Sequence, residues 1–332
     1  MNSIKVFSPA SVSNVCCGFD VLGFSIEGLG DEIIIKKSNS KGIKIKRVTG
    51  YKVPDEIKKN TASVASQALL DYLGVDDGFD IEIKKNIKPG SGIGSSAASA
   101  VGAVYGINKI LGNPLRKEDL LKFAMQGEFI SSKTAPADNV ASALHGGLIL
   151  VNNRENYNII NLPVPDNLLA IVHHPLIEIK TSESRSVLPK TVDINIASQQ
   201  LASIGGFIHS LHTGNFDLMR LILKDYLVEQ YRADHVPLFR EIKKIADSNN
   251  VICCSISGSG PSVFSLVSSY DKAKELKLIF DKTYSKNNIK FNSYITGLNS
   301  GGVRIIWFSI NWFLVNYQIH FFYTRFFRFF QF

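Results

Sequence analysis

A glycine-rich stretch at residues 88–100, K-P-G-S-G-I-G-S-S-A-A-S-A, most limits how this chain can fold. Apolar residues alternate just before it, at residues 79–83, which predicts a half-buried strand. Residues 95–111 after it are expected to form a helix that ends at Gly112. The sequence therefore predicts a strand, a glycine loop and a helix in succession. Free N–H groups at the start of such a helix favour an anion.

The loop differs from two common phosphate-binding patterns. A P-loop needs a lysine directly after its last glycine, and none follows Gly94. In the dinucleotide fingerprint the third glycine comes one residue later. The spacing alone leaves a glycine turn without a ligand as an alternative. The full run is more specific and resembles the second motif of the GHMP kinases, P-x-x-x-G-[LI]-G-S-S-A. That resemblance implies ATP binding by Pro89, Gly90, Ser91, Gly92, Ile93, Gly94, Ser95, Ser96, Ala97, Ala98 and Ser99.

The charge and the cysteines narrow the functional class. The net charge of +8 suits an anionic substrate such as ATP. No basic cluster with stacking aromatics precedes residue 304, so no nucleic-acid partner is expected. The four cysteines form two adjacent pairs, at residues 16–17 and 253–254, without metal-like spacing. Reduced thiols, and the direct start in an alternating strand, predict a cytoplasmic protein without a signal peptide.

Two further stretches carry polar side chains in loop-like surroundings. The pattern A-x-x-x-N-x-x-x-G-F-D-x-L-G contains Asn14 and Asp20 and resembles the first motif of homoserine kinases, a branch of the GHMP kinases. Turn chemistry is the alternative for both residues. Residues 134–147 resemble H-A-D-N-V-A-P-A-L-x-G-G, in which Asp138 and Asn139 match. Asp138 is alternatively a helix N-cap.

The second half of the chain continues the resemblance. T-S-E-S-R-S-V-L-P at residues 181–189 is similar to T-x-x-x-R-x-x-L-P, which places Thr181 and Arg185 on one helical face. Arg185 is either on a surface turn or a fork for a carboxylate. E-Q-Y-R, which ends at Arg232, is similar to E-P-Y-R. S-G-S-G-P-S contains Gly258 and Gly260 and resembles the third GHMP motif, although a plain glycine hairpin fits too.

Periodicity and turn residues predict the remaining elements. Strands are expected at residues 4–12, from 23 to about 27, 147–151, 157–162, 168–172, 289–296 and 301–306, with a hairpin at 31–37 and 42–48 and two strands flanking the glycine turn within 251–267. Helices are expected at residues 61–73 (capped by Asn60), 116–130, 193–213, 216–227, 237–248 and 272–284.

Residues 307–332 do not fit what precedes them. Residues 305–324 carry no formally charged side chain and could span a bilayer by length, but polar residues interrupt them. Three interpretations compete: read-through of a lost stop codon, an interfacial or membrane anchor, and a partner-binding extension. Apart from this tail, no membrane association is expected.

The stretches that resemble the family motifs, in order over residues 4–306, identify the chain as a member of the GHMP kinases, in their homoserine kinase branch. The resemblance implies a two-lobed α+β fold. Residues 1–163 would form an N-terminal lobe like domain 2 of ribosomal protein S5, residues 164–306 a ferredoxin-like lobe, and residues 307–332 an atypical tail. It also implies ATP-dependent phosphorylation of the L-homoserine hydroxyl to O-phospho-L-homoserine, a step in threonine biosynthesis, and a homodimer.

The resemblance assigns roles to the remaining polar residues. Ser96 and Glu128 would hold Mg²⁺, although Glu128 by itself could be a solvated helix-end residue. Asp20 would bind the substrate ammonium group. The other assigned residues are Arg185 and Arg232 for the carboxylate, Asn14, Asn139 and Thr181 for orientation, Gly258 and Gly260 for closure over the substrate, and Asp138 as the candidate base.

Two other functions stay open at this point. A sister kinase could phosphorylate another small alcohol, such as mevalonate, at the same ATP site. A non-catalytic nucleotide-binding descendant is the second alternative. It is favoured by the tail and by three departures from the motifs: Pro136 in place of a substrate-site His, Ser142 in place of Pro, and Gln230 in place of Pro.

Overall fold

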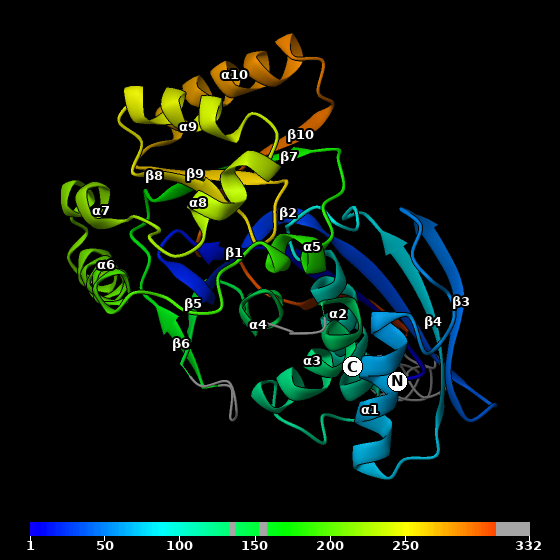
Figure 1. Ribbon diagram of the computed structural model, residues 1–332. Coiled ribbons are helices and arrows are strands. Elements are labelled where there is room, and N and C mark those ends of the chain that lie inside the picture. The colour runs from blue at the N-terminus through cyan, green and yellow to red at the C-terminus, as the bar shows by residue number, and fades with distance from the viewer. Residues whose placement is uncertain (133–136, 153–157, 310–332) are drawn as a thin grey trace, which may run out of the picture.

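The computed structural model describes residues 1–132, 137–152 and 158–309 (Figure 1). The strands are β1 (Ser3–Val15), β2 (Gly18–Ser38), β3 (Gly42–Gly50), β4 (Gly78–Lys85), β5 (Leu148–Val151), β6 (Ile159–Leu162), β7 (Leu169–Pro175), β8 (Cys253–Ile256), β9 (Val263–Val267), β10 (Phe291–Gly297) and β11 (Arg304–Ser309). The helices are α1 (Thr61–Leu73), α2 (Ser95–Ile110), α3 (Leu121–Ser132), α4 (Ala137–His145), α5 (Thr181–Ser186), α6 (Ile194–Thr213), α7 (Phe216–Ile222), α8 (Glu229–Arg232), α9 (Phe239–Ser248) and α10 (Tyr270–Lys286), with short 3₁₀ turns at Glu118–Leu120 and Ala233–His235.

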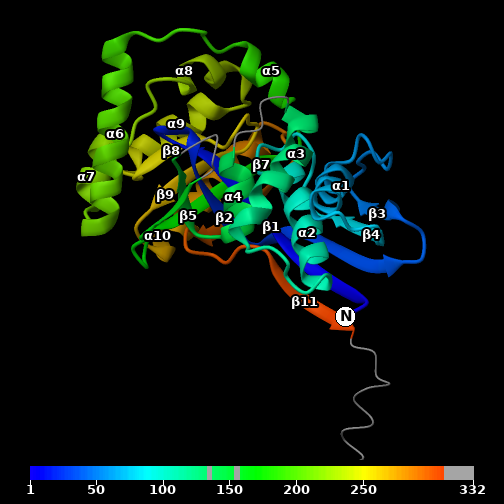
Figure 2. The same ribbon diagram turned by 90° about the horizontal axis from the view of Figure 1, so that it is seen from below.

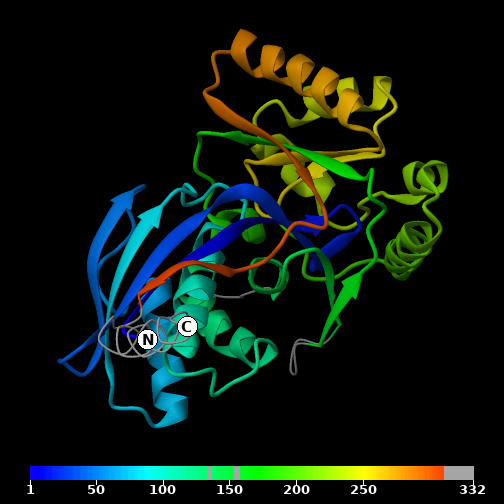
Figure 3. The same cartoon turned by 180° about the vertical axis from the view of Figure 1, so that it is seen from behind.

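The first sheet has seven strands in the order β11-β1-β2-β4-β3, with β5 and β6 joined at the side of β2. Helices α1, α2 and α3 lie on one face of it, and Figure 3 shows the opposite face without helices over its long strands. The predicted alternation in β4 points Phe79, Ile81 and Ile83 into this helical layer, where all three are buried. Small residues on α2, including Gly102 and Gly106, let the helix lie close to the sheet.

The predicted hairpin at residues 31–37 and 42–48 is wrong. Strand β2 runs without interruption from Gly18 to Ser38 and pairs with β1 and β4. Strand β3 instead pairs in parallel with β4. Parallel neighbours need a crossover, and α1 provides it between β3 and β4. The helix between the strands therefore decides the pairing, and local alternation could not reveal it.

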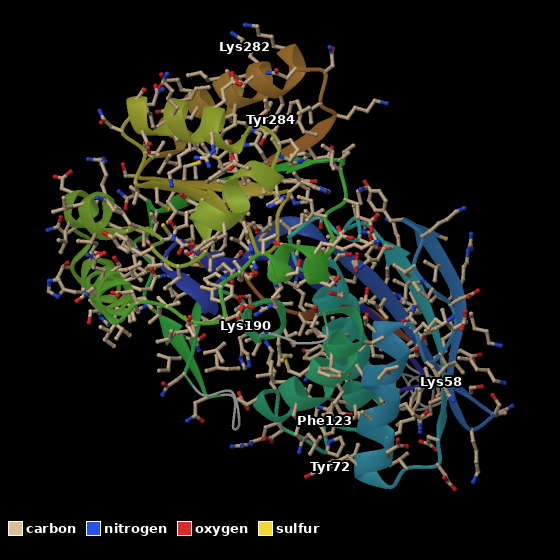
Figure 4. The ribbon with its side chains drawn as sticks, viewed as in Figure 1. Lys58, Tyr72, Phe123, Lys190, Lys282 and Tyr284 are labelled. Carbon is tan, nitrogen blue, oxygen red and sulfur yellow. The ribbon has the colours of Figure 1, made fainter. Side chains whose placement is uncertain are left out.

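The second sheet has four antiparallel strands in the order β10-β7-β9-β8. Helices α9 and α10 lie on one face of it, while α6 and α7 stand to the side (Figures 1 and 2). Tyr284 on α10 is fully buried and stacks on His173 of β7 at 5.5 Å between ring centroids, whereas Lys282 points outward (Figure 4). The architecture is α+β, as the sequence predicted.

Two helices differ from their predicted bounds by more than two residues. The helix expected at residues 116–130 is a 3₁₀ turn followed by α3, and α7 ends at Ile222 rather than near residue 227. The carboxylate of Asp225 accepts hydrogen bonds from the backbone N–H groups of residues 227, 228 and 229. Such a local side-chain bond offers the backbone an alternative to a helix, so α7 stops before it.

The last described strand, β11, returns to the first sheet beside β1. It covers Arg304–Ser309, whereas residues 301–306 were predicted, so it extends three residues past the expected start of the tail. The first sheet thus contains a strand from beyond residue 163, and the boundary between the lobes stays a prediction. Within the described residues no helix has the length and apolar character of a membrane span. Residues 310–332 lie outside the described residues.

Candidate active site

A cavity of about 310 Å³ lies where the loops of the two sheets meet. Its lining contains most of the residues predicted from the motifs. They are Asn14, Asp20, Pro89, Gly90, Ser91, Gly92, Gly94, Ser95, Ser96, Ser99, Glu128, Asn139, Thr181, Arg185, Arg232 and Gly258. Ile93, Ala97, Ala98, Asp138 and Gly260 are absent from the lining among the described residues. One cavity therefore gathers side chains that are more than 200 residues apart in the sequence.

The glycine loop enters α2 as the sequence predicted. Gly92 and Gly94 have left-handed backbone conformations, with φ of 75° and 67°. A Cβ at Gly92 would lie 2.6 Å from the carbonyl oxygens of Ser257 and Gly260. Gly94 is the N-cap of α2. Because glycine has no side chain, this position gives the N–H groups of the first turn no side-chain capping bond. Those groups remain suited to phosphate oxygens.

Glu128 on α3 lines the cavity beside Ser96, which belongs to the first turn of α2. Its side chain is buried, and burial raises the pKa of its carboxyl group to about 7, while a hydrogen bond from Ser96 and the charge of Lys85 oppose the rise. The described residues contain no group of three His, Cys, Asp or Glu side chains that could hold a metal. A hydroxyl and a single carboxylate nevertheless fit Mg²⁺, which commonly uses one or two carboxylates together with substrate phosphates.

Asp20 and Arg185 both line the cavity and form an ion pair with each other. The Arg185 guanidinium donates two hydrogen bonds to the Asp20 carboxylate, at 3.0 and 2.8 Å. Arg185 comes from α5, where Thr181 forms the first residue of the helix and also lines the cavity. The two residues predicted to bind the ammonium group and the carboxylate of the substrate thus form one bidentate pair. A positive and a negative group are presented side by side.

Arg232 lines the same cavity, and its charge interacts with those of Arg185 and Asp20. Its guanidinium is buried and donates to the carbonyl oxygens of Ser184 at 3.2 Å and Gly258 at 2.7 Å. Burial, followed by the charge of Arg185, lowers the pKa of Arg232 to about 10, so the group stays charged at neutral pH. The ring of Phe19 lies 5.4 Å from the Arg185 guanidinium and 5.5 Å from that of Arg232. Phe19 belongs to the first motif, but the sequence predicted no role for it.

Asn14 and Asn139 are fixed by hydrogen bonds at the centre of the cavity. The Asn14 side chain donates to the carbonyl oxygen of Gly258 at 3.0 Å and accepts from the backbone N–H of Asp20 at 2.9 Å. The Asn139 amide donates to the Ser13 hydroxyl at 2.9 Å and accepts from the Ser11 hydroxyl at 2.8 Å. Both amides are therefore oriented before any substrate contacts them.

Asp138 is fully buried behind these two residues. Its carboxylate accepts from the backbone N–H groups of Asn14 at 3.3 Å and Asn139 at 2.9 Å. Burial, followed by the nearby charge of Asp20, raises the pKa of Asp138 to about 7. Because α4 begins at Ala137, Asp138 lies inside the first turn and the N-cap interpretation is wrong. The role of Asp138 as catalytic base stays a prediction. Its hydrogen bonds fit a structural role better, in which the carboxylate holds the backbone of Asn14 and Asn139.

The third motif, a turn between β8 and β9 of the second sheet, is hydrogen-bonded to the glycine loop. The Ser257 hydroxyl donates to the carbonyl oxygen of Gly92 at 2.7 Å, and the Ser262 hydroxyl donates to that of Ser91 at 2.6 Å. The sequence did not predict that these two serines hold the glycine loop. The S-G-S-G-P-S pattern contained the signal, because hydroxyls next to a glycine turn can reach a neighbouring loop. Gly260 lies against Val236 and shapes the turn instead of lining the cavity.

Two of the three departures from the motifs, Ser142 and Gln230, are among the described residues. Ser142 is buried within α4. Gln230 is exposed on α8 and donates to the carbonyl oxygen of Tyr226 at 3.2 Å. Neither lines the cavity in the part of the chain that the structure describes. Pro136 lies outside the described residues.

Comparisons with known proteins show the family of this chain. Residues 59–147 match the model of the GHMP kinase N-terminal domain, and residues 207–286 match that of the C-terminal domain. A homoserine kinase of Chlorobium phaeobacteroides (strain BS1) is 35% identical over 92% of this chain and 100% of its own length. One of Methanococcus vannielii is 34% identical over 86% and 94%.

Solved structures share the fold. The crystal structure of homoserine kinase from Cytophaga hutchinsonii is 41% identical, covers 92% of this chain and 98% of its own, and superposes with a TM-score of 0.89. The structure of L. major mevalonate kinase, at 17% identity and a TM-score of 0.67 over 88% and 95% of the two chains, shows the fold alone. The chain therefore belongs to the GHMP kinase family and, within it, to the homoserine kinases.

Proposed function

We propose that this chain transfers the γ-phosphoryl group of ATP to the side-chain hydroxyl of L-homoserine, giving O-phospho-L-homoserine for threonine biosynthesis. The observation that carries the proposal is one cavity lined by two chemically different sets of groups. The first set is the glycine loop with the start of α2, and the second is the pair of Asp20 and Arg185. The first suits a triphosphate and the second suits a zwitterion.

The charged pair matches an amino acid in both signs. The substrate ammonium group would bind the Asp20 carboxylate, while its carboxylate would bind the Arg185 guanidinium, which suits planar bidentate acceptors. Arg232, buried against Gly258, adds a second positive charge behind them. An alcohol without an amine, such as mevalonate, would leave Asp20 without a matching group. This arrangement favours homoserine over the mevalonate-type alternative.

Phosphoryl transfer depends mainly on position and on charge stabilisation. Backbone N–H groups of the loop and of the first turn of α2 would hold the triphosphate. Ser96 and Glu128 would hold Mg²⁺, which offsets negative charge on the phosphoryl group. Asn14, Asn139 and Thr181 would orient the hydroxyl and the amine of the substrate. Asp138 would hold the backbone of Asn14 and Asn139 in place.

Two further features belong to this proposal. A cytoplasmic location is supported by the four cysteines, which are buried and free. A homodimer is supported by the family resemblance alone. The mass of the full chain in solution would test it.

The first experiment measures ADP release from Mg-ATP by the full chain with L-homoserine, with mevalonate and L-threonine as controls. Turnover that depends on homoserine is the expected result. It would also show that Pro136 is compatible with activity. ATP binding without turnover on homoserine would contradict the proposal and support a non-catalytic descendant, whereas turnover on mevalonate alone would support a sister kinase.

A further inference from the structure

Lys85 is a buried lysine that the motif analysis did not include. It is the last residue of β4, and its side chain is only 1% exposed. It nevertheless contributes to the lining of the cavity, beside Ser96 and Glu128. A buried lysine is unusual unless it is paired. Its partners therefore indicate why it is kept there.

The ammonium group of Lys85 uses all three of its donors. It donates to the Asp31 carboxylate, to the carbonyl oxygen of Ser95, and to the Ser99 hydroxyl at 2.9 Å. Ser95 and Ser99 belong to the first turns of α2. Lys85 thus ties the end of one strand to the start of the helix that is proposed to bind phosphate.

Asp31 is held as firmly as Lys85. Its carboxylate is fully buried and also accepts from the Ser99 hydroxyl at 2.9 Å, and from the backbone N–H groups of Asn86 at 3.0 Å and Ile87 at 3.2 Å. Those two N–H groups belong to the segment that leads into the glycine loop. The ion pair therefore fixes the entry and the exit of the loop relative to β2.

The pair is costly for stability in this position. A cation near the N-terminus of a helix opposes the helix dipole, and burying two charges carries a desolvation penalty. Among the described residues, Lys85 lines the cavity and Asp31 does not, so the positive end of the pair faces it. A local rule broken without a gain in stability commonly marks a functional position. Positive charge below a triphosphate site is such a function.

We propose that Lys85, anchored by Asp31, is a positioning residue for the nucleotide. It fixes the first turn of α2 relative to the glycine loop and places a positive charge beneath the bound triphosphate. The inference rests on the proposed function only in that the loop binds ATP. Because the three donors of Lys85 are occupied within the protein, it acts through the loop and through its charge.

The test compares Lys85→Met with Lys84→Met in the full chain. Lys84 is the adjacent lysine, but it is exposed and pairs with Glu32 on the surface at 3.0 Å. The Kd for ATP would be measured by calorimetry, the KM for L-homoserine by ADP release, and the stability by thermal unfolding. For Lys85→Met we expect ATP binding to weaken at least about tenfold, as for the loss of a charged hydrogen-bonding group, with the KM for L-homoserine within about twofold. Lys84→Met should leave all three quantities unchanged.

A second variant separates positioning from stability. Lys85→Met/Asp31→Asn removes both charges, so no buried carboxylate is left unpaired. We expect it to unfold at or above the temperature of Lys85→Met while ATP binding stays weak. Wild-type ATP binding in either variant, or failure of both to fold, would overturn the inference. A wild-type chain that binds ATP without phosphorylating homoserine would contradict the proposed function, and the ATP affinities would still test Lys85.

Discussion

At the scale of single residues, the pair of Asp20 and Arg185 decides which substrate can fit. Asp20 is buried and Arg185 is partly exposed, so the pair presents its arginine toward the cavity with its carboxylate held beside it. Each charge has a partner in the protein before the substrate binds. Selection of an amino acid then depends on exchanging one set of ion pairs for another.

Replacing Arg185 with Ala tests this exchange. We expect the KM for L-homoserine to rise about 100-fold, because a bidentate charged contact to the substrate is lost and the ion pair with the buried Asp20 carboxylate is lost too. The KM for ATP should change little. Arg240→Ala is a matched control, since Arg240 forms a bidentate pair with Asp234 on the surface. An unchanged KM for L-homoserine in Arg185→Ala would remove the carboxylate role.

Glu128 provides a test that depends on pH. Burial raises the pKa of Glu128 from 4.5 to about 7, so the folded protein holds this proton more tightly than the unfolded chain does. Without metal, the free energy of unfolding should therefore fall as the pH rises from about 4.5 to about 7, by on the order of 3 kcal/mol at most. Glu128→Gln should lose this contribution, while the fall caused by Asp138, whose pKa is also raised to about 7, stays in both proteins. Urea unfolding in EDTA across this range, with equal pH dependence in both proteins, would contradict the burial argument.

The predicted site residues were found at this scale with uneven success. The motif resemblance assigned Asn14, Asn139 and both arginines to the site, and the structure places all four in the lining of the cavity. Lys85 was missed because a lysine at a strand end usually lies in solvent, and nothing in its local sequence shows that it is buried. Its burial follows from α2 lying over β4, which is a tertiary contact.

At the scale of elements, the glycine loop is held by the third-motif turn of the second sheet. A Cβ on Gly92 would lie 2.6 Å from backbone carbonyl oxygens of that turn, and the Ser257 and Ser262 hydroxyls donate to carbonyl oxygens of the glycine loop. The loop therefore depends on the second sheet for its shape, although its sequence belongs to the first.

Gly92→Ala tests that dependence, with Gly74→Ala as its control. Both glycines have positive φ, but a Cβ at Gly74 would meet nothing within 4 Å among the described residues. Gly74→Ala should cost about 1 kcal/mol of stability from backbone strain alone. Gly92→Ala should cost roughly 3 kcal/mol or more, because a buried clash is added to the strain, and should raise the KM for ATP. Equal losses in urea unfolding would show that the close approach has no effect.

Elements with strong local signals were predicted well. Asn60 caps α1 as expected, its side chain accepting from the N–H groups of Ala62 and Ser63. The end of α7 was not predicted, because the Asp225 turn that replaces its last residues is one of several conformations open to such a sequence. The partner of β3 was not predicted either, because pairing depends on where α1 crosses the sheet.

At the scale of the whole molecule, the chain closes its first sheet with its last described strand. In β11, residues 307–309 pair with Lys5, Ile4 and Ser3 of β1. The predicted end of the second lobe at residue 306 would cut this strand in half. The boundary of a stable fragment therefore lies beyond the last recognisable motif.

Truncation at two points tests this closure. A chain that ends at Ile306 should be about 2 kcal/mol less stable than one that ends at Ser309, because it loses several backbone hydrogen bonds to β1. The activity with saturating substrates should be similar where both are folded, since β11 does not line the cavity. Identical urea midpoints for the two fragments would show that residues 307–309 contribute nothing to the sheet.

The sequence by itself determined the family, the α+β class, the glycine loop and most of the residues that line the cavity. These depend on spacing and residue type, which are local properties of the chain. Only the tertiary structure decided that Asp20 and Arg185 pair with each other, that Asp138 lies behind the cavity, and that Lys85 is buried beneath the loop. These facts depend on which surfaces pack together. The free energy of burying a charge or pairing two strands is set by neighbours that are distant in the sequence.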